Sequence, residues 1–359
     1  VVVLGGGLSG GFLAAALVER GCRVCLFDDP AADGASAGAA GLYNVVTGRR
    51  MALTWGAPLL VAALDAFFHS EIGRPLARYR QLLPVYRPYP DAAMQALWSR
   101  RFADPEYQPW IAAIEQPIAP EQYHNPLGGF LVQGVGRVQV AAFLAALFKA
   151  LEATGRFERV PLRIDYAAID PESRQLAAGG RTWAYEALAC CEGMAATTNP
   201  FWDIRALVPL KGQILRIAAS GLRVSEVWVG EGIFILPEGD DIFTLGSTYE
   251  TRFTTEAPTA EGRQTLLDAY HRLLPHQPPP EVRWHWANLR PATADHLPVA
   301  GEHRHHAGLF FLNGLGSKGV LHAAAVAPGL ADWIVSGDRQ ALHPAFHFYR
   351  PVMVKPKPS

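Results

Sequence analysis

The 359-residue sequence has few of the features that mark several large classes of protein. Only 18% of its residues are charged, and the 32 Lys and Arg residues nearly cancel the 33 Asp and Glu residues, which leaves a net charge of −1. This balance disfavours nucleic acid as a partner, although a local basic patch stays compatible with it. Half of the residues are apolar, which excludes a disordered chain and supplies a sizeable core.

Cysteines and long apolar runs are also scarce. Four cysteines at these positions do not make the disulfide framework of a small secreted domain, and the Cys22-x-x-Cys25 pattern at the start of an apolar strand indicates a structural role. Charges and prolines interrupt every apolar run before the ~18–20 residues of a membrane span, so we expect no membrane partner. The first residues lack a basic segment, so we expect no signal peptide and a cytoplasmic location; residues before Val1 are left open.

The first 28 residues have the pattern of a βαβ unit. Residues 1–4 form an unbroken apolar run that is typical of a strand buried on both faces, and the small apolar residues 12–18 predict a tightly packed helix that ends at Gly21. A second buried strand, residues 23–27, leads to Asp28. Because parallel strands need a crossover helix, the unit predicts an α/β protein with a parallel sheet covered on both faces.

Further elements follow from hydrophobic periodicity. We expect helices over residues 58–68, 91–102, 138–151, 261–274 and 320–335, and a mostly helical segment from 53 to 114. We expect strands within 157–191, as an antiparallel meander with a buried strand at its end, and also within 207–248 and over 309–312. Glycine loops between strand and helix occur near both ends of the chain, which predicts one nucleotide-binding domain assembled from separated segments.

The glycine loop after the first strand fits the dinucleotide fingerprint, Gly5-x-Gly7-x-x-Gly10. The first glycine permits a tight turn, the second lets a pyrophosphate approach the backbone, and the third lets helix and strand pack closely. Asp28, 18 residues past Gly10, is positioned to accept hydrogen bonds from a ribose diol. A glycine-rich turn without a nucleotide is the alternative, and the fingerprint leaves NAD and FAD open. The cofactor-binding residues predicted here are Gly5, Gly7, Leu8, Ser9, Gly10, Asp28 and Asp29.

Four dispersed stretches carry a family resemblance. They are the fingerprint with its acid, residues 35–50, the Arg-Pro…Asp…Pro…Gly pattern within residues 286–301, and the glycine-rich loop 313–319 with the helix after it. The sequence thereby resembles the FAD-dependent amino-acid and amine oxidoreductases of the D-amino-acid oxidase and glycine oxidase type. Within that group it is similar to small bacterial members that are like the flavin domain of a bifunctional tRNA-modifying enzyme.

The resemblance implies noncovalent FAD in a discontinuous Rossmann-like domain. This FAD-binding domain would comprise residues 1–52, 127–200 and 286–359, with an inserted, mainly antiparallel α+β substrate domain at 53–126 and 201–285. We expect Ser317 to cap the following helix, and we expect His322 to leave the flavin unattached. The further cofactor contacts predicted are Ala35, Ser36, Ala40, Gly41, Gly193, Gly314, Gly316, Ser317, Lys318 and Gly319.

Arg290 and Lys318 are the residues predicted to serve catalysis. Arg290 matches the arginine that pairs with the substrate carboxylate in glycine-oxidase-like relatives, a task that suits the planar guanidinium. A structural arginine bound by backbone carbonyls is the alternative. Lys318 would add a full charge to a loop whose N–H groups stabilise anionic reduced flavin, and Asp295 is expected to be a turn residue. Other candidates for the pocket are Arg49, Arg50, Trp55, His69, Phe234 and Tyr249.

The function that the resemblance implies is oxidation of the C–N bond of a small amine or amino acid to an imine, by hydride transfer to flavin N5. Electrons would pass to O₂ or to another acceptor. A flavoenzyme acting on a modified tRNA base, an NAD-linked dehydrogenase and a non-enzymatic flavoprotein stay as alternatives; a basic patch near Arg49, Arg50, Arg100 and Arg101 would favour the first of these. The histidines at 303–306 lack metal-ligand spacing, so we expect no metal. Substrate identity and oligomeric state stay open.

Overall fold

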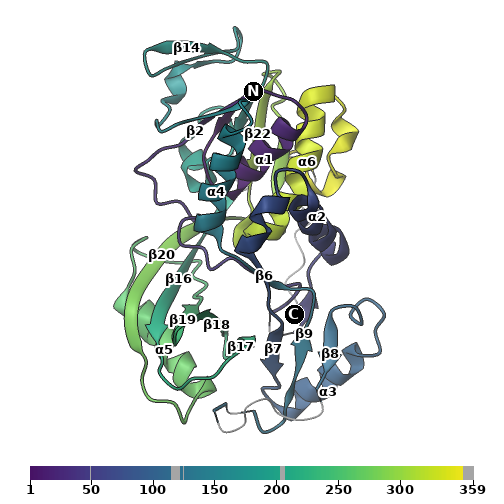
Figure 1. The fold of residues 1–359 in the computed structure, drawn as a ribbon, viewed down its shortest axis with the longest axis vertical. Helices are drawn as coiled ribbons and strands as arrows, with labels where there is room; N and C mark the ends of the chain where they lie inside the picture. Colours follow the sequence, from purple (N-terminus) through teal and green to yellow (C-terminus); the bar gives the residue numbers. More distant parts are fainter. Residues whose placement is uncertain (49, 115–121, 124, 203–206, 351–359) are drawn as a thin grey trace.

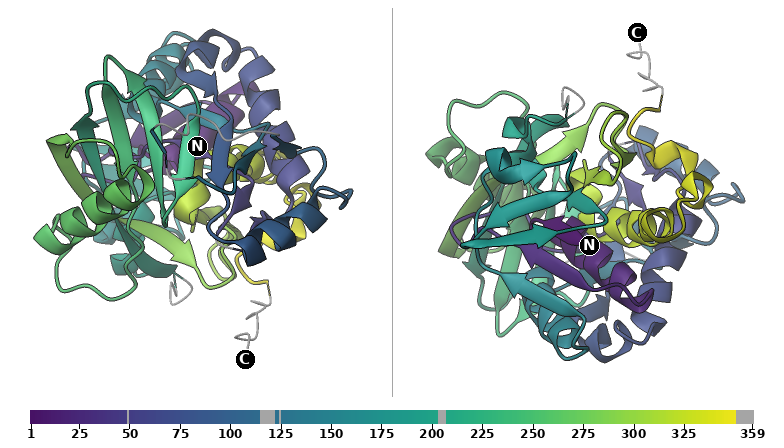
Figure 2. Two further views of the ribbon diagram at one scale, coloured as in Figure 1. Left: turned by 90° about the horizontal axis from the view of Figure 1, so that it is seen from below. Right: turned by 90° about the horizontal axis from the view of Figure 1, so that it is seen from above.

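Two large sheets organise the part of the chain that the structure describes (Figures 1 and 2). The computed structural model describes residues 1–48, 50–114, 122–123, 125–202 and 207–350. A six-stranded sheet with its helices occupies the upper part of Figure 1, and an eight-stranded sheet occupies the lower part. The predicted α/β fold, a Rossmann-like part joined to a mainly antiparallel part, is confirmed.

The six-stranded sheet is assembled from segments that lie far apart in the sequence. Four of its strands, β1, β2, β15 and β22, are buried along their whole length, as a parallel sheet covered on both faces requires. All neighbouring strands are parallel except β21 and β22. The strand order is β11 (Phe157–Val160), β2 (Val24–Phe27), β1 (Val2–Leu4), β15 (Leu188–Cys190), β22 (Leu309–Asn313) and β21 (Val299–Glu302).

Four helices pack together beside this sheet (Figure 1). The first, α1, is buried from Leu8 to Val18, because α4 and α6 both pack against it and its small residues allow close approach. The predicted helices are confirmed to within a few residues, and α1 begins earlier than expected because the glycine loop leads directly into it. The helices are α1 (Leu8–Glu19), α2 (Ala57–His69), α4 (Val140–Glu152) and α6 (Gly319–Ser336).

The segment Gly316–Ser336 has the length and apolar composition of a membrane-spanning helix, and among the described residues it is the only one that does. The expectation that no apolar run reaches this length is therefore wrong for α6. However, 56% of its apolar 18-residue window is buried inside the protein, and α6 packs against α1 and α2. The same apolar composition thus serves a core helix.

The eight-stranded sheet is antiparallel except where β17 pairs with β7. Helix α5 (Ala260–Leu273) packs on β16, β18 and β19, and helix α3 (Ala92–Arg101) follows β7 in the chain. The strand order is β20 (Glu281–Thr293), β16 (Leu207–Ala218), β19 (Ile242–Gly246), β18 (Ile233–Gly239), β17 (Val227–Gly230), β7 (Val85–Pro88), β9 (Gly129–Val132) and β8 (Ile111–Ala113).

The prediction of a mostly helical segment from 53 to 114 is wrong in part. Helices α2 and α3 are present, but β6, β7 and β8 lie in the same segment, because pairing with distant strands overrides the local pattern. The two-domain division stays a prediction; β9 belongs to the eight-stranded sheet, so a division by sheets would assign 129–132 to the substrate part. Shorter pairings join β3 (Leu42–Tyr43), β10 (Gly136–Val138) and β6 (Arg80–Leu82), and also β4 (Val46–Thr47) and β5 (Ala52–Leu53).

The expected meander over 157–191 is also only partly correct. Its first strand, β11, joins the six-stranded sheet in parallel with β2, and only the middle forms an antiparallel sheet, which lies at the top of Figure 1. That sheet contains β12 (Ile169–Asp170), β13 (Gln175–Ala178) and β14 (Arg181–Ala184). The 3-10 turns are η1 (Arg74–Tyr79), η2 (Tyr166–Ala168), η3 (Gly193–Thr198), η4 (Gly316–Lys318), η5 (Arg339–Ala341) and η6 (Pro344–Phe346).

Candidate functional site

A cavity of about 2030 Å³ extends from the ends of the six-stranded sheet to the inner face of the eight-stranded sheet. It is larger than the ~300–1,000 Å³ of a typical small-molecule site, so it has room for a dinucleotide and a second ligand. Two predicted residues, Gly10 and Gly314, lie outside its lining and are packed against protein atoms instead. The predicted residues that line it are Gly5, Gly7, Leu8, Ser9, Asp28, Asp29, Ala35, Ser36, Ala40, Gly41, Gly193, Arg290, Gly316, Ser317, Lys318 and Gly319.

The glycine loop between β1 and α1 forms a cradle that only glycine can build. Gly5 has a φ of +101°, and a Cβ there would lie 2.5 Å from the carbonyl oxygen of Cys191. Gly7 occupies the N-cap position of α1, so the first N–H groups and the positive end of this helix face the cavity beside the loop. This arrangement is a ready-made site for a pyrophosphate.

Asp28 lies at the end of β2, beside the glycine loop. Its Oδ1 accepts a hydrogen bond from the backbone N–H of Gly6 at 2.9 Å, and its Oδ2 lies 2.5 Å from an N–H group of Arg159. The sequence did not single out Arg159, because the parallel pairing of β11 with β2 was not foreseen. Asp28 also lines the cavity, so its carboxylate is placed where it would accept a hydrogen bond from a ribose hydroxyl.

A second glycine-rich loop connects β22 to α6. Asn313 donates a hydrogen bond from Nδ2 to the carbonyl oxygen of Gly193 at 2.8 Å, which ties this loop to the start of η3, shortly after β15. The expectation that Ser317 caps the helix is wrong: it lies inside the turn η4, and Lys318 occupies the N-cap position of α6. Burial lowers the pKa of His322, which follows in α6, to about 4, so its ring is neutral at pH 7.

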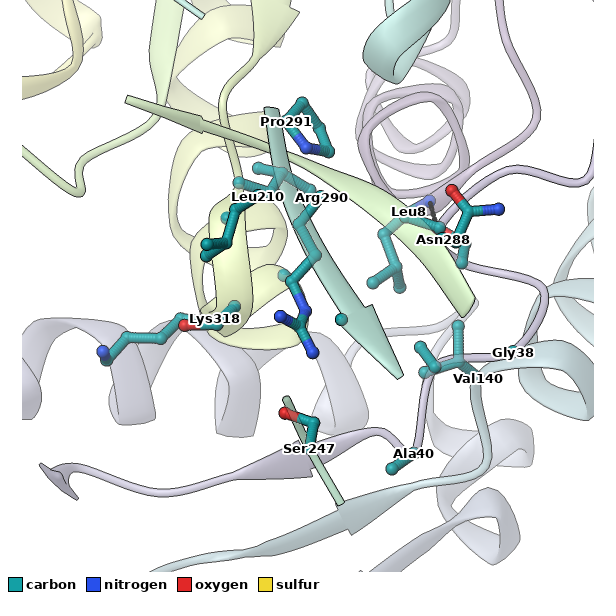
Figure 3. Close-up of a pocket in the computed structure, with 18 of the residues that line it drawn as sticks. Leu8, Gly38, Ala40, Val140, Leu210, Ser247, Asn288, Arg290, Pro291 and Lys318 are labelled. Carbon is teal, nitrogen blue, oxygen red and sulfur yellow. Dashed lines mark hydrogen bonds between the residues drawn. The ribbon is translucent and has the colours of Figure 1, made fainter. Parts of the chain in front are cut away.

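Arg290 projects from β20 into the cavity (Figure 3). A Cβ at Gly212, on the paired strand β16, would lie 2.0 Å from its Nη2, so the glycine makes room for the guanidinium. Arg290 contacts the carbonyl oxygen of Thr248 at 3.4 Å and lies 4.8 Å from the ring centre of Tyr249. No ion pair joins it to an acid among the described residues, and burial lowers its pKa. It is thus available to an anion.

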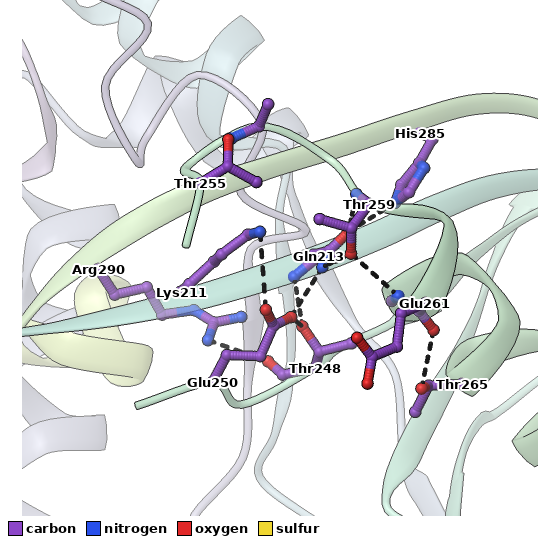
Figure 4. A network of polar contacts seen from close by, with 12 residues as sticks. Lys211, Gln213, Thr248, Glu250, Thr255, Thr259, Glu261, Thr265, His285 and Arg290 are labelled. Carbon is purple, nitrogen blue, oxygen red and sulfur yellow. Dashed lines mark hydrogen bonds and ion pairs between the residues drawn. The ribbon is translucent and has the colours of Figure 1, made fainter. Parts of the chain in front are cut away.

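A polar network lies on the opposite face of β16 (Figure 4). Glu250 accepts hydrogen bonds from Gln213 Nε2 at 2.8 Å and from Thr248 Oγ1 at 2.5 Å, and its Oε2 lies 3.6 Å from the fully buried Nζ of Lys211. Although burial opposes it, these hydrogen bonds and the Lys211 charge lower the pKa of Glu250. Because Thr248 and Tyr249 are the contacts of Arg290, the network holds the segment against which the arginine rests.

 The Gln213 side chain extends the network. Its Oε1 accepts a hydrogen bond from the backbone N–H of Thr259 at 2.9 Å and lies 2.9 Å from Nε2 of His285. Thr259 in turn caps α5 by accepting a hydrogen bond from the N–H of Gly262 at 3.1 Å. One side chain on β16 therefore connects β20, α5 and the segment after β19.

Several other candidates lie away from the cavity. Trp55 packs against His343 and Phe346, His69 bonds the carbonyl oxygen of Asp65, and neither lines the cavity. The same holds for Arg50, Arg100 and Arg101, whereas Phe234 and Tyr249 do line it. Arg49 lies outside the described residues. Among the residues that the structure describes, no group of three His, Cys, Asp or Glu side chains is arranged to hold a metal ion.

Two further interpretations concern acids and thiols. Asp295 forms a two-pronged ion pair with Arg350, at 3.0 and 2.9 Å, and accepts a hydrogen bond from the N–H of Leu297, so its role as a turn residue is confirmed. Cys22 and Cys25 are free, and burial raises the pKa of Cys25 to about 12, which accords with a structural role.

Sequence reasoning missed one wall of the cavity. Arg87, Tyr89 and Trp98 line it, and they come from β7, the residue after it, and α3. The segment was expected to be mostly helical, so nothing in its local pattern placed Arg87 in a buried strand. The arginine itself, in an otherwise apolar Val-Tyr-Arg-Pro-Tyr run, was the available signal.

The fold and the cavity together define a dinucleotide-binding α/β protein with a second, antiparallel part. The family model described as "FAD dependent oxidoreductase" (DAO) matches residues 1–333, and the chain belongs to this family of FAD-dependent enzymes. The glycine cradle, the helix N-terminus and Asp28 fit FAD, which is the cofactor of the family.

Curated relatives agree with this assignment. The chain is 28% identical over 364 residues to the bifunctional protein ThiO/ThiG of Trichormus variabilis, covering 98% of this chain and 55% of that protein. It is 25% identical over 353 residues to the glycine oxidase of Geobacillus kaustophilus, covering 93% and 92%. It is 26% identical over 359 residues to the tRNA 5-methylaminomethyl-2-thiouridine biosynthesis bifunctional protein MnmC of Marinobacter nauticus, covering 93% and 55%. The chain thus spans about half the length of the two bifunctional relatives.

Solved structures share the whole fold. The crystal structure of glycine oxidase from Geobacillus kaustophilus superposes with a TM-score of 0.79 at 21% identity, covering 98% of both chains. That of L-proline dehydrogenase from P. horikoshii superposes with a TM-score of 0.77 at 13% identity, covering 95% of this chain and 94% of the other. These likenesses concern the fold alone.

The cradle generates a first prediction. Gly5→Ala should lower FAD occupancy several-fold, because the new Cβ would collide with the backbone of Cys191 and displace the loop. The flavin-to-protein absorbance ratio of the purified protein measures this. Gly155→Ala is the matched control, since Gly155 also has a positive φ but has no atom within 4 Å of its Cβ position. A Gly5→Ala protein with normal flavin content would contradict the assignment of the cradle.

The network on β16 generates a second prediction. Glu250→Gln should lower the free energy of unfolding by about 3 kcal/mol at pH 7, because it leaves Lys211 buried without an anion. Adding Lys211→Met should recover part of this loss, since it removes the uncompensated charge. Urea unfolding measures both, and Glu281→Gln, in the exposed pair with Arg283, is the control.

The effect of Glu250→Gln on the free energy of unfolding should depend on pH. The pKa of Glu250 is lowered in the folded protein. Its contribution to the free energy of unfolding is therefore present above the unfolded pKa of about 4.3 and is lost as the pH falls through the folded pKa. The stability difference between the wild type and Glu250→Gln should therefore shrink below about pH 4. A difference that stays constant into acid, or a double variant that shows the plain sum of both losses, would contradict a coupled pair.

Proposed function

We propose that this flavoenzyme oxidises the C–N bond of a small amine or amino acid to an imine, and that Arg290 binds the carboxylate of the substrate. The observation that carries the proposal is the guanidinium of Arg290: it lies in the same cavity as the glycine cradle and has no ion pair with a described acid. A planar guanidinium in such a position favours two-pronged binding of a carboxylate.

Different segments of the chain would bind different parts of the cofactor. The loop around Gly5 and Gly7, with the start of α1, would hold the pyrophosphate of FAD, and Asp28 would hold the ribose. The loop 316–319 and Lys318 would stabilise the negative charge of the reduced cofactor. FAD, when bound, supplies the acceptor for the two electrons of the C–N bond.

Arg290 would contribute chiefly orientation. Fixing the carboxylate fixes the α-carbon relative to the cofactor, and correct placement is most of what this oxidation requires of a protein. The Thr248 carbonyl oxygen and the Tyr249 ring restrain the guanidinium before substrate arrives, so less conformational freedom is lost on binding.

The names of the relatives support a small amino-acid substrate, since glycine oxidase is among those that match over nearly the full length of this chain. O₂ or another electron acceptor, and a cytoplasmic location, remain part of the proposal. A second candidate is a carboxymethylamino group on a modified tRNA base, because MnmC proteins also match over 93% or more of this chain. A basic patch beside the cavity would favour this second candidate; Arg100 and Arg101 do not line the cavity itself.

The test is the visible spectrum of the holoenzyme during anaerobic addition of glycine, N-methyl amino acids, D-amino acids and a carboxymethylamino nucleoside. Loss of the flavin band near ~450 nm with a free amine supports the first candidate, and loss with the nucleoside alone supports the second. A holoenzyme that none of these compounds reduces would count against both.

A third prediction concerns Arg290. Arg290→Met should lower kcat/KM for the substrate found in this way by about 10- to 100-fold, because charge-assisted hydrogen bonds to the carboxylate are lost. Stopped-flow flavin reduction measures the effect. Arg283→Gln, on the same strand but in an exposed ion pair with Glu281, should leave the rate unchanged. An unchanged kcat/KM in Arg290→Met would show that another group binds the carboxylate.

A further inference from the structure

A buried histidine on α6 lines the cavity and has one ring nitrogen without a partner. His322 is 2% exposed, and neither the glycine cradle nor the loop 316–319 makes use of its side chain. Its Nδ1 lies 3.0 Å from the carbonyl oxygen of Leu315. Among the described residues, no group forms a hydrogen bond with its Nε2. Buried polar atoms are usually satisfied, so this nitrogen is a place where the cavity would receive a ligand.

The contact with Leu315 determines which ring nitrogen of His322 carries the proton. A carbonyl oxygen can only accept, so Nδ1 donates its N–H to Leu315. The ring is neutral at pH 7, because burial and, to a lesser extent, the nearby charge of Lys318 lower the pKa of His322. In a neutral imidazole with the proton on Nδ1, the other nitrogen carries a lone pair. Nε2 is therefore a hydrogen-bond acceptor.

Nε2 of His322 reaches the cavity and is not sealed inside the core. Some side chains of the described part of the chain do have a fully buried polar atom without a partner, for example the ring nitrogens of Trp202 and Trp228. Nε2 of His322 is not among these atoms, so it keeps accessible surface. Because His322 is otherwise buried and lines the cavity, this surface belongs to the cavity. The lone pair is thus open to a ligand.

The position of His322 on α6 places it between the two loops that would bind the cofactor. Gly319 and His322 are three residues apart in one helix, so they share a face of it. A Cβ at Gly319 would lie 3.0 Å from Cδ1 of Leu8, the first residue of α1, and all three residues line the cavity. This face of α6 therefore looks onto the proposed pyrophosphate site, and the loop 316–319 directly precedes it.

The chemistry of FAD offers a partner for an acceptor at this position. The pyrophosphate and the isoalloxazine ring are joined by the ribityl chain, which carries three hydroxyl groups, and a hydroxyl can donate a hydrogen bond. The other polar groups here are donors: the N–H groups at the start of α1, those of the loop 316–319, and Lys318. Donors suit phosphate and carbonyl oxygens, whereas a lone pair on Nε2 suits a hydroxyl.

We propose that Nε2 of His322 accepts a hydrogen bond from a hydroxyl group of the ribityl chain of FAD, and that the carbonyl oxygen of Leu315 orients the ring for this contact. The inference concerns how the chain holds the cofactor of its family, so it does not depend on which amine is oxidised. A histidine that only ties α6 to the preceding loop at Leu315, without contact to FAD, is the rival account.

The test compares FAD with its 2′-, 3′- and 4′-deoxyribityl analogues, each bound to the full-chain protein. Flavin fluorescence gives the Kd of each cofactor, so no turnover is needed. His322→Leu should raise the Kd of FAD about tenfold, because one buried hydrogen bond is lost. For one of the three analogues, the wild type and His322→Leu should have Kd values within about twofold of each other, since neither can form the bond. An unchanged Kd of FAD, or equal weakening of FAD and all three analogues, would overturn the proposal.

A further cofactor analogue tests the ring as the alternative partner of Nε2. The oxidised isoalloxazine ring has one N–H donor, at N3, and FAD methylated at N3 lacks it. The proposal predicts that His322→Leu weakens the binding of N3-methyl-FAD as much as that of FAD. If the effect of His322→Leu instead disappears with N3-methyl-FAD, the histidine meets the ring and the ribityl contact is wrong.

Two conservative variants separate the FAD contact from a structural role. The side-chain amide of Gln reaches the position of Nε2, whereas that of Asn reaches only the position of Nδ1. His322→Gln should therefore keep the Kd of FAD within about threefold of the wild type, and His322→Asn should resemble His322→Leu. His276→Leu, at an exposed histidine outside the cavity lining, should leave the Kd unchanged. An Asn variant that binds FAD better than the Gln variant would favour the rival account. If His322→Leu does not fold, the comparison of Gln with Asn still decides.

Discussion

Arg290 and Arg87 carry positive charges that no described acid neutralises, and these charges constrain what the cavity can bind. A buried guanidinium keeps its charge at any physiological pH, so its burial is costly until an anion arrives. In this protein Arg290 has a carbonyl oxygen and an aromatic ring as neighbours, and Arg87 has two carbonyl oxygens and Trp98. These contacts hold the cations in place but leave their charge for a ligand. An anionic group of a ligand would therefore meet, at these two positions, a positive charge that no described acid neutralises.

The two sheets make this arrangement possible through their different construction. The parallel sheet ends in loops whose N–H groups and helix N-termini would receive the phosphates and the reduced cofactor. The antiparallel sheet presents side chains from alternate positions, so it can place charged groups at chosen points on one face while the other face packs on α5. Arg290 and Arg87 both belong to this second sheet, on strands that come from opposite ends of its sequence range.

The fold and the cofactor site were largely predictable because their signals are local. The Gly5–Gly10 loop, the buried strands beside it and Asp28 all occur within 28 residues, and each has its own physical reason. The loop at 313–319 and the strand before it were equally clear. The β7 region was not, since β7 acquires its strand character from β17 and β9, which lie far away in the sequence.

The same difference between local and long-range signals explains which site residues could be predicted from the sequence. Arg290 was found through its motif, but Arg87 carries no motif and becomes visible only when β7 is placed in the sheet. The ion pair of Lys211 with Glu250 was likewise beyond the sequence, because it depends on the register in which residue 250 returns to β16. Ser317 shows the opposite error: a residue type suited to capping lies one position too early.

Because side chains alternate between the two faces of β16, this strand separates the cavity from the polar network behind it. Leu210, Gly212 and Ile214 line the cavity, while Lys211 and Gln213 lie in the polar network behind it. A single inserted or deleted residue in this strand would exchange the two sets, placing the Lys211 ammonium under Arg290 and a glycine in the network. Homologous proteins that keep this site should therefore vary in the loops around β16 but preserve the parity of its length, so that any insertion there comes in pairs or as a bulge.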